Sequence, residues 1–122
     1  MFKVSKKGDI KLTRGDSAYL TIDIIDFNNS LYILDPEHDD IRVQVRWKYN
    51  DDEEEAFLFE GDITDNGDGT ATWHIKPEDT NKADVSIDYY YDIEIKIDED
   101  IYTIISAKFN LLDEVTLPKK NE

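Results

Sequence analysis

The side chains that could do chemistry in this sequence are two histidines, many carboxylates and hydroxyls, and no cysteine. His38 falls in an expected loop and His74 on the expected exposed face of a strand, and neither has a recognisable partner motif. No serine stands in a Gly-x-Ser-x-Gly nucleophile elbow, and no glycine-rich loop is spaced to cradle a phosphate. Asp and Glu together number 29, so a glycosidase-like carboxylate pair stays open but marks no particular site. The sequence therefore predicts no enzyme, no catalytic residue and no cofactor.

Two acidic segments could hold a cation, and both are interpreted as loops. Residues 64–75 match part of an EF-hand calcium loop, but the first position is Thr64 and the last is Ile75, where that loop needs carboxylates. We therefore predict no metal site but a tight hairpin turn at Asp65–Gly69, with glycines where φ must be positive. The run Asp51–Glu55 is interpreted as a solvated loop, with weak cation binding as the alternative.

Arg14-Gly15-Asp16 spells the integrin-binding tripeptide. Gly and Asp are also ordinary turn residues, because glycine accepts strained backbone and Asp bonds to nearby backbone groups. Nothing else in the sequence points to an extracellular ligand. We interpret the tripeptide as a turn between two strands.

The charge balance restricts the partners. The formal net charge is −15, with 14 basic and 29 acidic residues, so phosphate backbones and anionic membranes are repelled and basic partners are favoured. The absence of cysteine fits a reducing compartment. Residues 1–7 are basic but lack the apolar stretch of a signal peptide, and nothing approaches the length of a membrane span. We expect a protein made in the cytoplasm that binds neither nucleic acid nor membrane.

Apolar and polar residues alternate along most of the chain, which predicts half-buried β-strands. In Ile41–Tyr49, five apolar side chains would share one face of a strand, whereas a helix would scatter them. Further strands are expected at Ile10–Leu12, Ala18–Ile24, Ala56–Phe59, Ala71–Ile75, Tyr89–Ile97 and Ile101–Leu111, and a short strand or edge segment at Leu31–Leu34. Only Pro77–Ala83 predicts helix, of a turn or two, because Pro suits a first helical position.

The same alternation predicts which large aromatic residues lie in the core. Trp47 and Trp73 are in phase with apolar neighbours, so both are predicted to lie in the core. Tyr89 or Tyr91, at the start of the penultimate strand, is the candidate for a tyrosine corner.

The pattern predicts a single all-β domain, an antiparallel immunoglobulin-like sandwich of seven to eight strands. We place it at residues 8–116, between a flexible N-terminus at 1–7 and a flexible tail at 117–122. A small closed barrel is the competing fold, and periodicity alone does not separate the two.

The second half of the chain resembles a known family. The matching segments are Lys76–Thr80, Tyr89–Ile95, Ile101–Ile105, Lys108-Phe109 and Glu114–Thr116, joined by Ile10–Leu20 and Asp68-Gly69 nearer the N-terminus. In this order they are similar to the immunoglobulin-like N-terminal domain of upper-type baseplate proteins of tailed phages, and to short prophage structural proteins. The sequence departs from the family in Ser106–Phe109, which lacks the usual glycine, and in the turn Asp98–Asp100.

The resemblance implies a non-enzymatic structural module of a phage tail or baseplate, located in the virion or in the host cytoplasm during assembly. It implies tail or baseplate proteins, or further copies of the chain, as partners. Three tyrosines that alternate away from the core, Tyr19, Tyr90 and Tyr102, either make cross-strand pairs or form a contact surface. The alternative function is a stand-alone binding module, for example for carbohydrate, that uses these tyrosines and the acidic loops.

Overall fold

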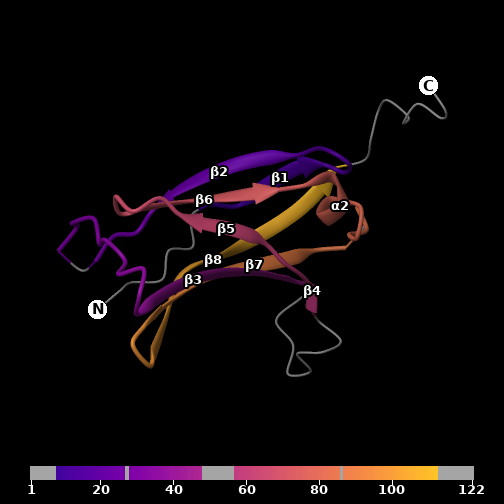
Figure 1. Cartoon of the computed structure of the whole chain (residues 1–122). Coiled ribbons are helices and arrows are strands. Elements are labelled where there is room, and N and C mark those ends of the chain that lie inside the picture. The colour runs from indigo at the N-terminus through magenta and orange to yellow at the C-terminus, as the bar shows by residue number, and fades with distance from the viewer. Residues whose placement is uncertain (1–7, 27, 48–56, 86, 113–122) are drawn as a thin grey trace.

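The computed structural model describes residues 8–26, 28–47, 57–85 and 87–112, which form two β-sheets packed face to face (Figure 1). The termini, the acidic run Asp51–Glu55 and Tyr49 lie outside the described residues, so the predictions for them stay predictions. The described strands are β1 (Ile10–Thr13), β2 (Ala18–Asp23), β3 (Asp39–Arg46), β4 (Phe57–Glu60), β5 (Asp62–Asp65), β6 (Thr70–Ile75), β7 (Tyr89–Ile97) and β8 (Asp100–Leu112).

The strand order is that of an immunoglobulin-like sandwich. One sheet has the order β1-β8-β7-β3-β4 and the other the order β2-β6-β5. The predicted all-β sandwich is confirmed, and a single closed barrel is excluded because the two sheets are separate. One pair differs from the antiparallel expectation: β1 runs parallel to β8.

The core lies between the sheets and is built by the inner rows of the alternating strands. Trp73 on β6 is 1% exposed, as predicted, and its ring centroid lies 5.3 Å from Tyr91 and 5.9 Å from Phe109. Ile93 and Ile95 on β7 are fully buried. The central strands therefore carry the most completely buried side chains, as strands flanked on both sides should.

The chain changes sheets at Gly61, between β4 and β5. The Gly61 N–H donates to the Val43 carbonyl at 2.9 Å, so the crossover is tied to β3. A Cβ at this position would lie 2.4 Å from Trp73 Nε1 and 2.5 Å from Val43 Cγ1. Only glycine lets the backbone approach the core this closely, and the sequence did not predict β5 as a separate strand.

The connection from β6 to β7 contains the helix α2 (Pro77–Thr80), a single turn that lies within the predicted segment. Among the described residues, no helix has the length and apolar character needed to cross a bilayer. The Tyr89 hydroxyl accepts a hydrogen bond from the Asp84 backbone N–H at 2.9 Å. Tyr89, and not Tyr91, therefore forms the tyrosine corner that ties this connection to the sheet.

Two expectations about orientation are wrong. Trp47 is 42% exposed and not in the core, because β3 ends at Arg46 and alternation does not extend past the end of a strand. Tyr102 faces the core opposite Ile95, because an extra residue in β8 shifts the phase of the strand near Ile104. Of the short strand or edge segment expected at Leu31–Leu34, the structure has no extended strand but an isolated antiparallel bridge between Leu31 and Ile25.

Candidate interaction surfaces

The three tyrosines of the expected contact surface lie in three different places. Tyr19 is 69% exposed on the outer face of the three-stranded sheet. Tyr90 lies on the outer face of the five-stranded sheet, because its neighbours along β7, Tyr89 and Tyr91, are both buried in the core. Tyr102 faces the interior, so no single surface contains all three.

Tyr19 belongs to a sheet face rich in threonine, which we call the threonine face. The pairing of β2, β6 and β5 places Thr21, Thr72 and Thr64 in one row and Tyr19 beside His74 in the next. Thr21 Oγ1 lies 3.2 Å from Thr72 Oγ1. The Tyr19 and His74 rings stack at 4.2 Å between centroids, so one face of the Tyr19 ring is covered by the histidine.

Tyr90 lies in a cross-strand row that alternates aromatic and cationic side chains. The register of β4, β3, β7 and β8 aligns Phe57, Arg46, Tyr90 and Lys108. Arg46 Nη2 donates to Gln44 Oε1 at 2.7 Å, which holds the guanidinium along β3. The row therefore places two cationic side chains, Arg46 and Lys108, in alternation with Phe57 and Tyr90 on a chain whose net charge is −15.

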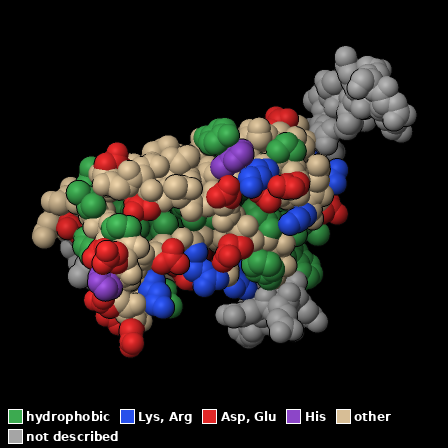
Figure 2. Space-filling model, in the orientation of Figure 1, with side chains coloured by type: hydrophobic (Ala, Val, Ile, Leu, Met, Phe, Trp, Pro, Cys, Tyr) green, Lys and Arg blue, Asp and Glu red, His purple; other side chains and the backbone are tan. Residues whose placement is uncertain are grey.

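Three large aliphatic side chains form a third surface at one end of the sandwich. Ile25, Leu31 and Ile33 are 43%, 51% and 62% exposed, and we call them the aliphatic patch. They lie on the connection between β2 and β3, at the end that also holds the β5–β6 and β7–β8 turns (Figure 1). Figure 2 shows hydrophobic and acidic side chains gathered at this left-hand end. We call this end, with its three connections, the loop end.

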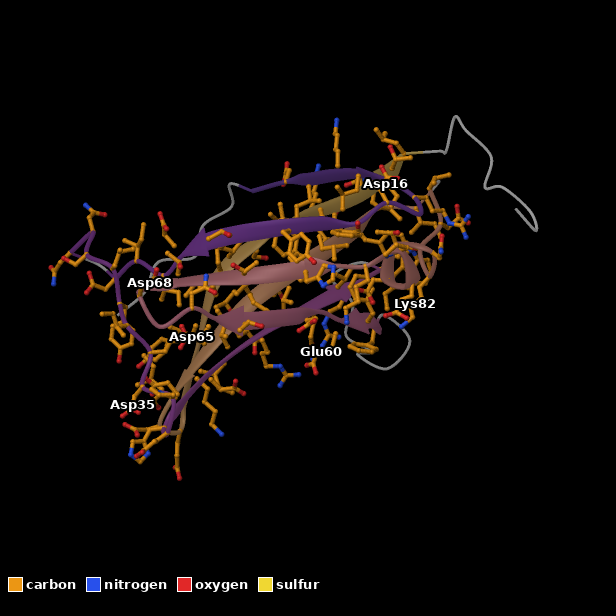
Figure 3. All side chains as sticks on the ribbon, turned by 45° about the horizontal axis from the view of Figure 1, so that its top comes forward. Asp16, Asp35, Glu60, Asp65, Asp68 and Lys82 are labelled. Carbon is orange, nitrogen blue, oxygen red and sulfur yellow. The ribbon has the colours of Figure 1, made fainter. Side chains whose placement is uncertain are left out.

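Carboxylates surround the aliphatic patch. Figure 3 shows Asp35, Asp65 and Asp68 at the loop end, far from Asp16 and Lys82 at the opposite end. Partial burial raises the pKa of the Tyr32 hydroxyl, and the carboxylates of Asp39, Asp98 and Asp35 raise it further. Charges from two separate connections therefore converge around this side chain.

Several of these carboxylates also shape the turns. Asp26 Oδ1 accepts from the backbone N–H groups of Asn28 and Ser30, at 2.9 and 3.2 Å. Asp68 accepts from the hydroxyl and the N–H of Thr70, and these hydrogen bonds lower the pKa of Asp68. The acidic residues are thus both turn formers and surface charges.

At the opposite end, the Arg14-Gly15-Asp16 tripeptide is a turn, as predicted. Gly15 has a φ of 92°, and Arg14 donates from Nε to the Ala83 carbonyl and from Nη2 to the Asn81 carbonyl, at 3.1 and 3.0 Å. The guanidinium therefore joins the β1–β2 turn to the α2 region. This use of Arg14 is structural.

The predicted hairpin turn at Asp65–Gly69 is also confirmed. Gly67 and Gly69 have φ values of 81° and 89°, and the turn joins β5 to β6. Ile75, at the last position of the calcium-loop match, is fully buried in β6. Within the described residues, no group of three or more His, Cys, Asp or Glu side chains could hold a metal ion.

The sequence alone does not reveal the aliphatic patch. It predicts a short strand or edge segment for Leu31 and Ile33, and it does not distinguish Ile25 from other apolar residues. The signal that could have revealed it is the alternation in residues 31–34, where Leu31 and Ile33 would share one face. The segment is short and close to Pro36, which disfavours a paired strand that would cover this face. Their grouping with Ile25 depends on the bridge between Ile25 and Leu31.

Neither a protein-family model nor a curated protein matches the sequence. The resemblance to phage baseplate domains therefore stays a prediction.

Proposed function

We propose that the protein is a non-enzymatic assembly module of a phage or prophage tail or baseplate. The aliphatic patch is the observation that carries this proposal. Large aliphatic side chains that stay half exposed side by side, on a chain of net charge −15, favour a contact with another protein. The immunoglobulin-like sandwich and the sequence resemblance support the phage assignment.

Co-purification tests the proposal. The tagged chain is expressed with the tail and baseplate genes of the genome that encodes it, and the complexes are separated by size. We expect the chain to elute with at least one tail or baseplate protein, and Ile33→Ser to weaken that association. A chain that elutes as a monomer at high concentration, without any tail protein, would contradict the proposal, as would neighbouring reading frames unrelated to tails.

Carbohydrate binding is the second candidate function, and the threonine face favours it. Tyr19 is 69% exposed next to a row of threonine hydroxyls, and a sugar needs both an aromatic ring face and hydrogen-bonding groups. The stack with His74 leaves one face of the Tyr19 ring for a ligand. A glycan-array signal that Tyr19→Ala abolishes and Tyr90→Ala leaves intact would support this candidate. An array without signal removes it.

A further inference from the structure

We propose that the aliphatic patch docks a basic, aliphatic segment of a partner protein. Leu, Ile or Val side chains of that segment would cover Ile25, Leu31 and Ile33, and its Lys or Arg side chains would meet the surrounding carboxylates. This inference rests on the proposed function as a binding module, and it adds the place of the contact and the chemistry of the partner.

The patch is held in place by a small hairpin. Ile25 and Leu31 pair as an antiparallel bridge, and the Tyr32 N–H donates to the Ile24 carbonyl at 2.7 Å. The Asp26 N–H donates to the Ser30 carbonyl at 3.0 Å, which closes the turn. The backbone beneath the aliphatic side chains is therefore paired before a partner binds, and this preorganisation favours affinity.

The hairpin is also fitted against the next connection. A Cβ at Gly69 would lie 2.8 Å from Leu31 Cβ, so Leu31 packs directly on the backbone of the β5–β6 turn. The Ile24 N–H donates to the Gly69 carbonyl at 2.8 Å. The patch consequently lies against the turn that carries Asp65 and Asp68.

The charge around the patch selects a basic partner. Residues 24–39 contain four carboxylates, residues 65–69 contain two and residues 98–100 contain three, and none of these segments contains Lys or Arg. The net charge of −15 attracts a basic segment at long range, and the local carboxylates attract it at short range, so both effects favour a basic partner. A second copy would bring the same acidic end against itself, and like charges disfavour that arrangement.

The aliphatic patch favours basic segments that also carry aliphatic side chains. Lysines alone would be attracted to any acidic part of the surface, whereas aliphatic side chains gain only where they cover other apolar groups. Burying the exposed part of one large aliphatic side chain changes an affinity by about tenfold. The proposal therefore requires both properties in one segment.

The test is a titration with a short soluble peptide that carries spaced isoleucines and lysines. Two matched peptides have isoleucine replaced by serine, or lysine replaced by glutamate. Affinity is measured by fluorescence anisotropy, and the site by backbone amide chemical shifts. We expect the Ile/Lys peptide to bind about tenfold more tightly than either matched peptide. The shifts should centre on residues 24–35, and binding should weaken as salt rises.

Variants with matched controls locate the contact. Ile33→Ser should weaken binding of the Ile/Lys peptide about tenfold, whereas Leu112→Ser, at another half-exposed aliphatic residue on the last strand, should not. Glu37→Gln with Glu99→Gln should weaken it about threefold, and Glu78→Gln on α2 should leave it unchanged.

Four results overturn the proposal. The first two are a Ser/Lys peptide that binds as tightly as the Ile/Lys peptide, and chemical-shift changes centred away from residues 24–35. The third is a dimer that buries the patch without any peptide. The fourth is a tenfold gain in peptide affinity when the chain's own basic residues 1–7 are deleted. The titration contains no tail protein. A failed titration would therefore contradict the basic partner without affecting the co-purification result. A failed co-purification with a successful titration would contradict only the assignment to a phage assembly.

Discussion

At the scale of single residues, Gly61 is a tightly constrained position. It lies where the chain passes from one sheet to the other, and its backbone approaches both the Trp73 ring and a Val43 methyl group. Both neighbours are buried, and neither is the far end of a flexible side chain. A side chain at this position must therefore displace the core itself.

Gly61→Ala is expected to destabilise the fold by about 3 kcal/mol, because the added methyl group overpacks a site without free space. The measurement is the midpoint and slope of urea unfolding. Gly67→Ala is the matched control: a Cβ there meets nothing within 4 Å, so only its φ of 81° adds strain, of about 1 kcal/mol. Equal losses in the two variants would contradict the close approach at Gly61.

Tyr91 gives a prediction for alkaline pH. Its hydroxyl donates to the Gly8 carbonyl at 2.5 Å, and burial, with a smaller contribution from the Asp9 carboxylate, raises the pKa of Tyr91 to about 12. The unfolded chain loses this proton near the ordinary pKa of 10.0, and the folded chain keeps it up to about 12. Stability from this group is therefore complete below pH 10 and is lost as the pH rises through that window.

Tyr91→Phe should lower the free energy of unfolding at neutral pH, because the bond to Gly8 is lost. The variant should also lose less stability than the native chain between about pH 10 and pH 12. Urea unfolding at several pH values measures both effects. Tyr19→Phe, at an exposed ring, is the control and should follow the native curve. Parallel curves for Tyr91→Phe and the native chain would contradict the assignment.

At the scale of elements, hydrogen bonds between connections hold the ends of the strands in place. Thr80 on α2 is fully buried, and its Oγ1 accepts from the Gly15 N–H at 3.0 Å. Its hydroxyl lies within donating distance of the Pro77 and Asp16 carbonyls. Together with Arg14, this residue joins the β1–β2 turn to the β6–β7 connection, which are far apart in sequence.

Thr80→Val keeps the shape of the side chain and removes the hydroxyl. We expect a loss of about 1–3 kcal/mol, because the Gly15 N–H then has no acceptor in a partly buried place. Thr21→Val, on the exposed threonine face, is the control and should change stability by less than about 0.5 kcal/mol. Calorimetric melting measures both variants. A Thr80→Val variant as stable as the control would contradict a stabilising role for the Thr80 hydroxyl between the two connections.

At the scale of the whole molecule, charge governs both stability and association. A chain of net charge −15 repels itself when it is compact, and the loop end concentrates that repulsion. Salt screens interactions between exposed charges over distances of about 10 Å or more. It should therefore stabilise the fold and permit self-association, while weakening the contact with a basic partner.

The Tm is expected to rise between about 20 mM and about 300 mM NaCl, as self-repulsion is screened. Glu37→Lys with Glu99→Lys removes repulsion at the loop end, so this variant should melt higher than the native chain at low salt and respond less to added salt. Differential scanning calorimetry at several salt concentrations gives both values. A Tm that falls with salt would mean that attractive ion pairs outweigh the repulsion.

The sequence by itself determined every described strand except β5, most of their inner faces and several turns, because alternation and turn chemistry act between near neighbours. It correctly predicted Trp73 in the core, the helix starting at Pro77 and a tyrosine corner at Tyr89 or Tyr91. These features need no knowledge of which strands are neighbours.

Only the tertiary structure decided the order of the strands, the change of sheet at Gly61 and the inward or outward orientation of the β8 residues that precede Ile104. Each depends on contacts between residues distant in the sequence, which periodicity does not record. The same reason explains Tyr102, predicted to face outward and found facing the core, and the aliphatic patch. Ile25 and Ile33 become one surface only when the hairpin folds and no strand covers it among the described residues.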